Sequence, residues 1–274
     1  LQRRVMVLLS VLSGLLTPLI IQATPDQVNV LFSYVLVLNV VALFLSYSKN
    51  WSELRIISFF TTATIYITYY FHFDPESWGK PFFYSTSLFL VYVVGLFVTS
   101  KLNQNKFSGL NLYLGVLTAI HFVFWSVFIF SSFEMSYAVP CLIVAATFVG
   151  GAIYIYKSNP QESIPALVYF LMGVFSLAIS GEDFSQVFSA VGLPYVVNAS
   201  MWFVIAILVF VIGRKLQYQV VKYAGIAAWV LVIAYWYSVA WEVEWLPWFG
   251  VKFIPFINSG ALLWMVIAAS GFYL

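Results

Sequence analysis

Ten apolar stretches recur along the chain, and short polar segments separate them. A helix of about 20 apolar residues is long enough to cross the hydrocarbon core of a bilayer. A backbone that crosses lipid must satisfy its own hydrogen bonds, and an α-helix does so within one segment. The sequence therefore predicts an all-α, polytopic membrane bundle of about ten transmembrane helices in antiparallel hairpins. The predicted spans are residues 5–23, 28–47, 54–71, 81–100, 111–132, 138–156, 164–180, 196–213, 221–240 and 254–274.

Composition supports lipid as the surrounding solvent. Of the 274 residues, 63% are hydrophobic and 8% are charged, whereas a soluble domain has roughly 25% charged residues. The net charge of +2 comes without a basic cluster, which argues against nucleic acid as a partner. A single cysteine, Cys141, excludes an internal disulfide and a multi-thiolate metal site. We interpret residues 1–274 as a single transmembrane domain of a longer chain.

The charges of the loops are sorted by side. Ten of the twelve Lys and Arg residues lie before the first span or in the even-numbered loops. Eight of the ten acidic residues lie in the odd-numbered loops. Basic loops stay in the cytoplasm, so the N-terminus is predicted to be cytoplasmic and the acidic loops to face outward.

The segment "SGEDFSQVFSAVGLP" (180–194) follows the seventh span. Its apolar residues Phe184, Val187, Phe188 and Val191 have the spacing of one helical stripe. Ser180 and Asp183 fit a capping box. We expect a short amphipathic interfacial helix near 182–191, which either packs on the bundle as a lid or gates a cavity.

Acidic residues and tryptophans gather on the predicted outer face. The segment "WEVEWLPWF" (241–249) is typical of an aromatic belt at the headgroup level, and a platform for a sugar or a headgroup is the alternative. A transferase active site on this face is a further alternative. Its candidate residues are Asp74, Glu76, Glu182, Asp183, Glu242, Glu244 and Trp245.

The predicted spans carry almost no charge in their middle thirds, and no Asp or Glu lies there. This argues against a carboxylate-based ion-coupled pump and against protease chemistry in the membrane. No nucleotide-binding or hydrolase motif is present, so we expect no catalytic residue, metal or cofactor. The remaining candidate is a polar pocket formed by Asn39, Thr62, Thr118 and His121. Near the bilayer centre His121 is expected to be neutral. It either bonds a neighbouring helix through Thr118 or Asn39, or lines the pocket.

The N-terminal segment "SGLLTPLIIQATPDQVNVLFSYVLVLNVVALFLS" resembles the bacterial predicted membrane proteins of domain-of-unknown-function family 2339. Gly14, Thr17, Pro18 and Tyr34 match the motif, and Asn39 stands where the family commonly has a polar residue. The resemblance implies a bacterial inner-membrane protein, and a fragment or short relative, because members are usually longer with more spans. It implies no activity and no catalytic residues.

Three functions remain open. The first is a non-enzymatic scaffold or assembly component of the envelope, whose partners are membrane lipids and other envelope membrane proteins. It predicts a filled bundle with an exposed groove. The second is a transporter or flippase of an apolar or amphipathic, lipid-like substrate, which needs a cavity at the midplane. The third is the outer-face transferase, whose acids must lie within about 10 Å of each other. We favour the scaffold and rank the transferase last.

Overall fold

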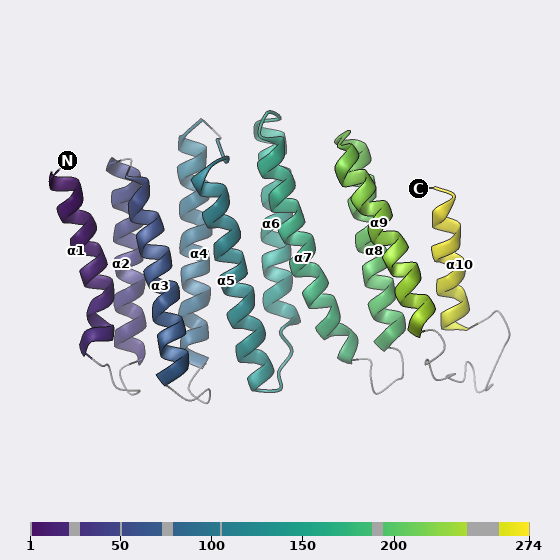
Figure 1. The fold of residues 1–274 in the computed structure, drawn as a ribbon, viewed down its shortest axis with the longest axis horizontal. Coiled ribbons are helices and arrows are strands. Elements are labelled where there is room, and N and C mark those ends of the chain that lie inside the picture. Colours follow the sequence, from purple (N-terminus) through teal and green to yellow (C-terminus); the bar gives the residue numbers. More distant parts are fainter. Residues whose placement is uncertain are drawn as a thin grey trace. The chain divides into compact units, whose positions relative to one another are not determined.

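The computed structural model describes residues 2–21, 28–49, 51–72, 79–104, 106–187, 194–239 and 258–273, which form ten α-helices and no strand (Figure 1). Each predicted span contains one helix, so the predicted all-α polytopic architecture is confirmed. The helices are α1 Gln2–Ile21, α2 Val28–Lys49, α3 Ser52–His72, α4 Gly79–Leu102, α5 Leu110–Ser132, α6 Ala138–Ser158, α7 Ser163–Val187, α8 Pro194–Lys215, α9 Gln219–Val239 and α10 Ser259–Gly271.

Seven helices are long and apolar enough to cross a membrane, judged over the described residues: α2 and α4 to α9. The apolar parts of α1 and α10 are shorter, Arg4–Thr17 and Ser259–Gly271. α3 has 21 residues, but four threonines together with Glu53 and Arg55 make it more polar. Three of its polar residues, Ser58, Thr61 and Thr62, are buried. The polarity of α3 therefore serves contacts with other helices.

The chain divides into two compact units, Leu1–Gly173 and Val174–Leu274, which we describe separately. We refer to them as unit 1 and unit 2. The prediction of a single transmembrane domain over 1–274 stays a prediction.

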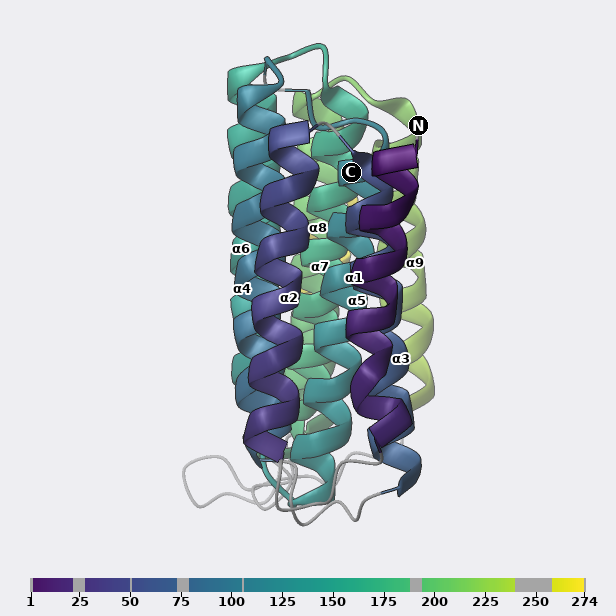
Figure 2. The same ribbon diagram turned by 90° about the vertical axis from the view of Figure 1, so that its left-hand side faces the viewer.

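Unit 1 contains α1 to α6 in two layers. Figure 2 shows α1, α3 and α5 on one side and α2, α4 and α6 on the other. α3 packs against α1, α2 and α5, which places it in the centre of its layer. The core holds fully buried side chains from several helices, among them Leu15, Phe32, Leu54 and Tyr66. The rings of Phe32 and Tyr66 lie 4.9 Å apart between centroids and tie α2 to α3.

Unit 2 is built on a tight hairpin of α8 and α9, with α10 packed against α8. Gly213 and Gly225 make the close approach possible. A Cβ atom on Gly213 would lie 2.4 Å from the backbone nitrogen of Lys222, and one on Gly225 would lie 2.5 Å from that of Phe210. In lipid, where helices gain no hydrophobic drive to associate, such close packing is a main source of affinity between helices.

In the described part of the chain, α4, α5 and α8 are each followed by a non-glycine residue in the left-handed conformation, namely Gln104, Glu134 and Gln217. Gln217 has a φ of 57°, and Tyr218 N–H donates to Gly213 O at 2.9 Å. Glu134 has a φ of 53°, and Met135 N–H donates to Phe130 O at 2.8 Å. These bonds close the last turns of α8 and α5 in the Schellman pattern.

The predicted separate helix near 182–191 is wrong over the residues described. Residues 182–187 continue α7, which runs without interruption to Val187. Gly181 does not break the helix, since it lies against Met201 of α8, and a Cβ atom there would lie 2.9 Å from the Met201 sulfur. Extending a helix adds one hydrogen bond for each residue, whereas a new helix needs a costly nucleus. Residues 188–191 lie outside the described part.

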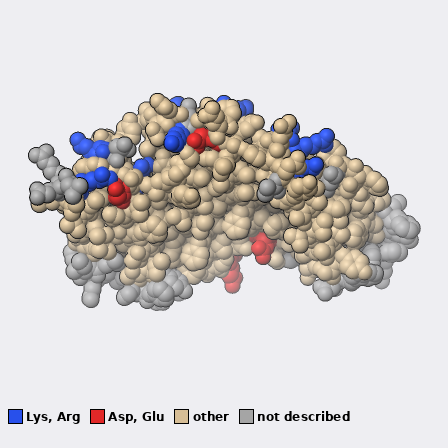
Figure 3. Space-filling view, turned by 45° about the horizontal axis from the view of Figure 1, so that its top comes forward, with Lys and Arg blue, Asp and Glu red and all other residues tan. Residues whose placement is uncertain are grey.

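Many large apolar side chains are exposed on the helix flanks, including Phe44, Phe83, Phe124 and Leu231. Figure 3 shows a broad uncharged flank, in tan, below the Lys and Arg side chains at the helix ends. The basic residues in the last turns of α2, α4 and α6 are Lys49, Lys101 and Lys157. A positive charge there complements the negative end of the helix dipole. The surface therefore combines an apolar flank with charged ends.

Candidate functional site

Asn39 lies at the centre of a polar network that joins α2, α3 and α4. Its side chain is fully buried. The Nδ2 group donates to Val35 O and to Thr62 Oγ1, both at 2.8 Å. The hydroxyl of Tyr92 donates to Asn39 Oδ1 at 2.6 Å. The structure thus brings together two predicted pocket residues, Asn39 and Thr62, through a direct hydrogen bond.

Tyr92 extends the network back to α3. Its hydroxyl also lies 2.8 Å from Ser58 Oγ, and this oxygen lies 3.3 Å from Arg55 O. Each polar atom named in the network has a partner, which avoids the cost of an unpaired polar group in a dry interior. A network satisfied in this way holds three helices in one register.

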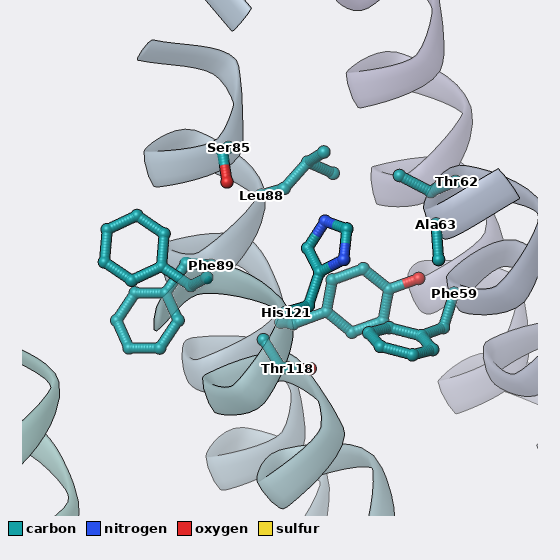
Figure 4. Close-up of a pocket in the computed structure, with 10 residues that line it drawn as sticks. Phe59, Thr62, Ala63, Ser85, Leu88, Phe89, Thr118 and His121 are labelled. Atoms are coloured by element: carbon teal, nitrogen blue, oxygen red, sulfur yellow. The ribbon is translucent and has the colours of Figure 1, made fainter. Parts of the chain in front are cut away.

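His121 lies in α5 and points between α3 and α4, toward Thr62 and Ala63 on one side and Ser85 and Leu88 on the other (Figure 4). The rings of Tyr66, Phe59 and Trp125 surround it, and the centroid of Tyr66 is 5.2 Å away in an edge-on arrangement. Its buried Nε2 atom has no hydrogen-bond partner among the described residues.

The expected hydrogen bond from His121 to Thr118 or Asn39 is therefore wrong. The Thr118 hydroxyl donates to Leu114 O at 2.7 Å, one turn earlier in its own helix. The Asn39 amide is already used by Val35, Thr62 and Tyr92. The imidazole is held by its aromatic neighbours instead of by a polar partner.

A small cavity lies beside His121, and Thr62, Thr118, Ser85 and Tyr92 help to line it. The volume in which the centre of a water molecule fits is about 20 Å³. One water needs roughly 10–15 Å³ by this measure, whereas small-molecule sites have pockets of about 300–1,000 Å³. The cavity has room for one water molecule and is too small for a lipid or a sugar. Asn39 does not line the cavity, but it is hydrogen-bonded to Thr62, which does.

The predicted outer-face cluster lies mostly outside the described residues. This applies to Asp74, Glu76, Glu242, Glu244 and Trp245. Glu182 and Asp183 are consecutive residues in α7. The predicted pairing of outer acids stays a prediction. In the described part of the chain, no three His, Cys, Asp or Glu residues gather as metal ligands would.

The polar contacts at the end of unit 1 where α3, α5 and α7 begin were not predicted from the sequence. Glu162, which precedes α7, accepts three hydrogen bonds from the segment before α5: from Phe107 N–H at 3.1 Å, Ser108 N–H at 2.7 Å and Ser108 Oγ–H at 3.1 Å. Arg55 is buried and donates to Asn111 Oδ1, and Asn111 Nδ2 donates to Ser100 Oγ at 2.8 Å. The sequence signal for the Arg55 contact was the charge itself, since Arg55 fell inside a predicted span. The contacts of Glu162 had no such signal.

An ion pair joins α1 to the start of α3. Arg4 pairs with Glu53 at 2.5 Å, and its guanidinium lies 5.9 Å from the centroid of the Trp51 ring. The hydrogen bond from Arg4 lowers the pKa of Glu53 below its ordinary value of 4.5. Both side chains are partly exposed, so the pair is worth little energy. Its role is to fix the position of α1 at the start of α3.

An apolar groove runs between α4 and α6 on the outside of unit 1. Its volume is about 340 Å³, and its lining is mostly aliphatic and aromatic. At Gly150 nothing lies within 4 Å of the position that a Cβ atom would occupy. Phe97 and Tyr154 contribute rings 6.0 Å apart. The lining residues are Val93, Val94, Phe97, Val98, Thr147, Gly150, Gly151 and Tyr154.

Comparison with known proteins gives one result. A family model described as "Predicted membrane protein (DUF2339)" matches residues 1–274. No curated protein and no solved structure matches the chain.

Proposed function

The chain belongs to the predicted membrane protein family DUF2339, and from this premise we propose that it is a non-enzymatic scaffold of the bacterial cell envelope. A scaffold holds other membrane proteins in place through its outer surface, and it needs no path for a solute through its interior.

The small size of the cavity beside His121 carries the proposal. At the level of His121 the cavity has a volume of about 20 Å³, and the polar atoms of Asn39 are bound by neighbouring helices. A transporter of lipid-like substrates needs a much larger space at this level. The described contacts therefore favour a rigid bundle over a conduit.

The α4–α6 groove is the surface on which we expect the scaffold to bind another membrane protein. Its floor at Gly150 is open, and small residues at a helix surface let another helix approach closely. Val94 and Val98 on the groove wall are exposed. We propose that a transmembrane helix of an envelope membrane protein lies in this groove, with membrane lipids around it.

Location and orientation are part of the same proposal. The last turns of α2, α4 and α6 are basic, and basic helix ends stay on the cytoplasmic side of the inner membrane. We therefore propose that the end of unit 1 that carries Glu53 and Glu162 faces the cytoplasm, and that Glu134 lies on the outer side.

Photo-crosslinking in intact cells tests the scaffold. A photoreactive amino acid at Val98, inside the groove, should yield one discrete protein adduct, whereas the same group at Phe124, on an exposed flank of α5, should not. Gly150→Leu, which fills the floor of the groove, should abolish the adduct. Ala227→Leu introduces a leucine at an exposed position of α9 and should leave the adduct unchanged. Adducts with lipid alone at both positions would contradict a scaffold and favour a lipid-handling role.

A further inference from the structure

The turn between α8 and α9 encloses an open polar cavity with a volume of about 350 Å³. Two basic side chains line it, Arg214 from the end of α8 and Lys222 from the first turns of α9. The other lining residues are Gly213, Gln217, Tyr218 and Gln219, which add amide and hydroxyl groups. The volume falls within the range of small-molecule sites, about 300–1,000 Å³.

The positive charge of this cavity is not neutralised within the described part of unit 2. Arg214, Lys215 and Lys222 form no ion pair there. Glu182 and Asp183 belong to α7 and do not line the cavity. Arg214 lies over the ring of Tyr273 at 5.7 Å from its centroid, and Lys222 lies over the ring of Phe210 at 5.9 Å. Cation–π contacts fix the side chains but leave the full positive charge in place.

The backbone gives the cavity a fixed shape. Tyr218 N–H donates to Gly213 O, and Lys222 N–H donates to Tyr218 O at 3.0 Å, so the turn is bonded on both sides. Gly213 lies directly against the backbone of Lys222. The two cations are therefore held at the rim of one rigid hairpin, which lowers the entropic cost of binding an anion.

From these contacts we infer that the α8–α9 cavity binds a phosphate group, and that an anionic phospholipid headgroup of the surrounding membrane supplies it. An arginine fork matches a phosphate in geometry, and a lysine adds a point charge. Basic pockets between helices at a membrane surface bind lipid headgroups in this way.

The apolar flank beside the turn favours a lipid over a free anion. Val204 and Leu208 of α8 and Tyr223 of α9 are exposed on the two helices that form the turn. Acyl chains of a lipid whose phosphate sits at Arg214 and Lys222 lie against such a surface. A soluble phosphate gains nothing from these side chains.

Binding measurements on the purified full chain test the inference. The protein in uncharged detergent is titrated with short-chain phosphatidylglycerol, short-chain phosphatidylcholine and inorganic phosphate, each by calorimetry. We expect saturable binding of phosphatidylglycerol that weakens with added salt. In the variant Arg214→Gln with Lys222→Gln this binding should weaken about tenfold or more. Arg214→Lys, which keeps the charge, should lose less.

The control removes the same charge elsewhere. Lys101→Gln with Lys157→Gln takes two exposed cations from helix ends of unit 1 and should leave the affinity unchanged. Circular dichroism and gel filtration check that each variant folds. Tighter binding of phosphatidylglycerol than of inorganic phosphate supports the headgroup, and the reverse supports a phosphate site for a soluble anion. Equal losses in the two double variants, or no saturable binding of either anion, would overturn the inference.

Discussion

At the scale of single residues, Asn39 and His121 show two ways of placing a polar group in an apolar bundle. Asn39 has partners on three helices. His121 is held by aromatic rings, and its Nε2 atom is buried without a partner. A buried amide that bonds neighbouring helices stabilises their register, whereas an unpaired ring nitrogen costs free energy. The two residues should therefore respond to substitution in opposite ways.

Replacing Thr62 with Val should lower the free energy of unfolding. The change keeps the shape of the side chain but removes the oxygen that accepts from Asn39 Nδ2. Hydrogen bonds between membrane helices are worth about 0.6 kcal/mol on average and up to about 1.7 kcal/mol. Reversible unfolding in mixed micelles measures the loss. Thr64→Val is the matched control, because Thr64 is exposed on the same helix and bonds only Phe60 O in its own backbone. Equal losses in the two variants would show that the Asn39 contact contributes nothing.

Replacing His121 with Phe should leave the protein folded and as stable, or more stable by about 1 kcal/mol. The ring keeps its contacts with Tyr66 and Trp125, and the unpaired Nε2 is gone. His121→Ala should instead cost about 3 kcal/mol, because it enlarges the cavity next to Thr118. Thermal unfolding in detergent distinguishes the two. A marked loss with Phe would mean that the imidazole nitrogen has a partner such as a water molecule.

The sequence identified these residues but not their contacts. Asn39, Thr62, Thr118 and His121 were selected because polar groups are rare in the spans, and Asn39 and Thr62 do meet. The hydrogen bond from Tyr92 to Asn39 was not foreseen, since a tyrosine in an aromatic-rich chain carries no signal of its own. Which faces meet depends on how the helices rotate and pack, and the positions of polar residues along the spans do not show this.

At the scale of helices, the association of α8 with α9 depends on how closely their backbones approach and not on hydropathy alone. The hairpin of α8 and α9 depends on two glycines, Gly213 and Gly225, that let backbone meet backbone. Hydropathy predicted the positions of both helices in the sequence, but it does not show how close they lie to each other. The error near 182–191 has another cause. The stripe spacing predicts a helix but does not show where that helix begins, and residues 182–187 belong to α7.

Replacing Gly225 with Ala should destabilise unit 2 by about 1–3 kcal/mol. The new Cβ atom would lie 2.5 Å from the backbone nitrogen of Phe210, and backbone cannot rotate away as a side chain can. Thermal unfolding in detergent measures the effect. Gly150→Ala is the control, because nothing lies within 4 Å of a Cβ atom there. That variant should be neutral or slightly more stable, since alanine favours a helix. A similar loss in both variants would contradict close packing as the cause.

At the scale of the whole molecule, the apolar stretches were the strongest signal in the sequence. They predicted each of the ten helices, because a long apolar run in lipid has hardly any other structure open to it. The division into two compact units carries no comparable signal, since the boundary at Gly173 falls inside α7. The outer acids could not be assembled into a site from sequence, because loop residues have no periodicity to fix their position.

Labelling of single cysteines tests the proposed orientation. In a variant whose native Cys141 is replaced by Ala, cysteines at Lys101 and Lys157 should be protected from a membrane-impermeant thiol reagent in intact cells. Cysteines at Lys80 and Glu134 should react, because they lie at the opposite helix ends. After lysis all four should react. The reverse pattern would place the basic ends outside and contradict the positive-inside assignment.

The closed turns after α5 and α8 have a practical consequence for handling this protein in detergent. Glu134 and Gln217 hold left-handed backbone angles, a conformation that costs side-chain-bearing residues about 1 kcal/mol or more. Glycine adopts it freely, so the same two turns offer sites for thermostabilisation that touch neither the Asn39 network nor the α4–α6 groove. Glu134→Gly alone would also spare the phosphate cavity, which makes it the first substitution to try when a purified sample must survive crystallisation or grid preparation.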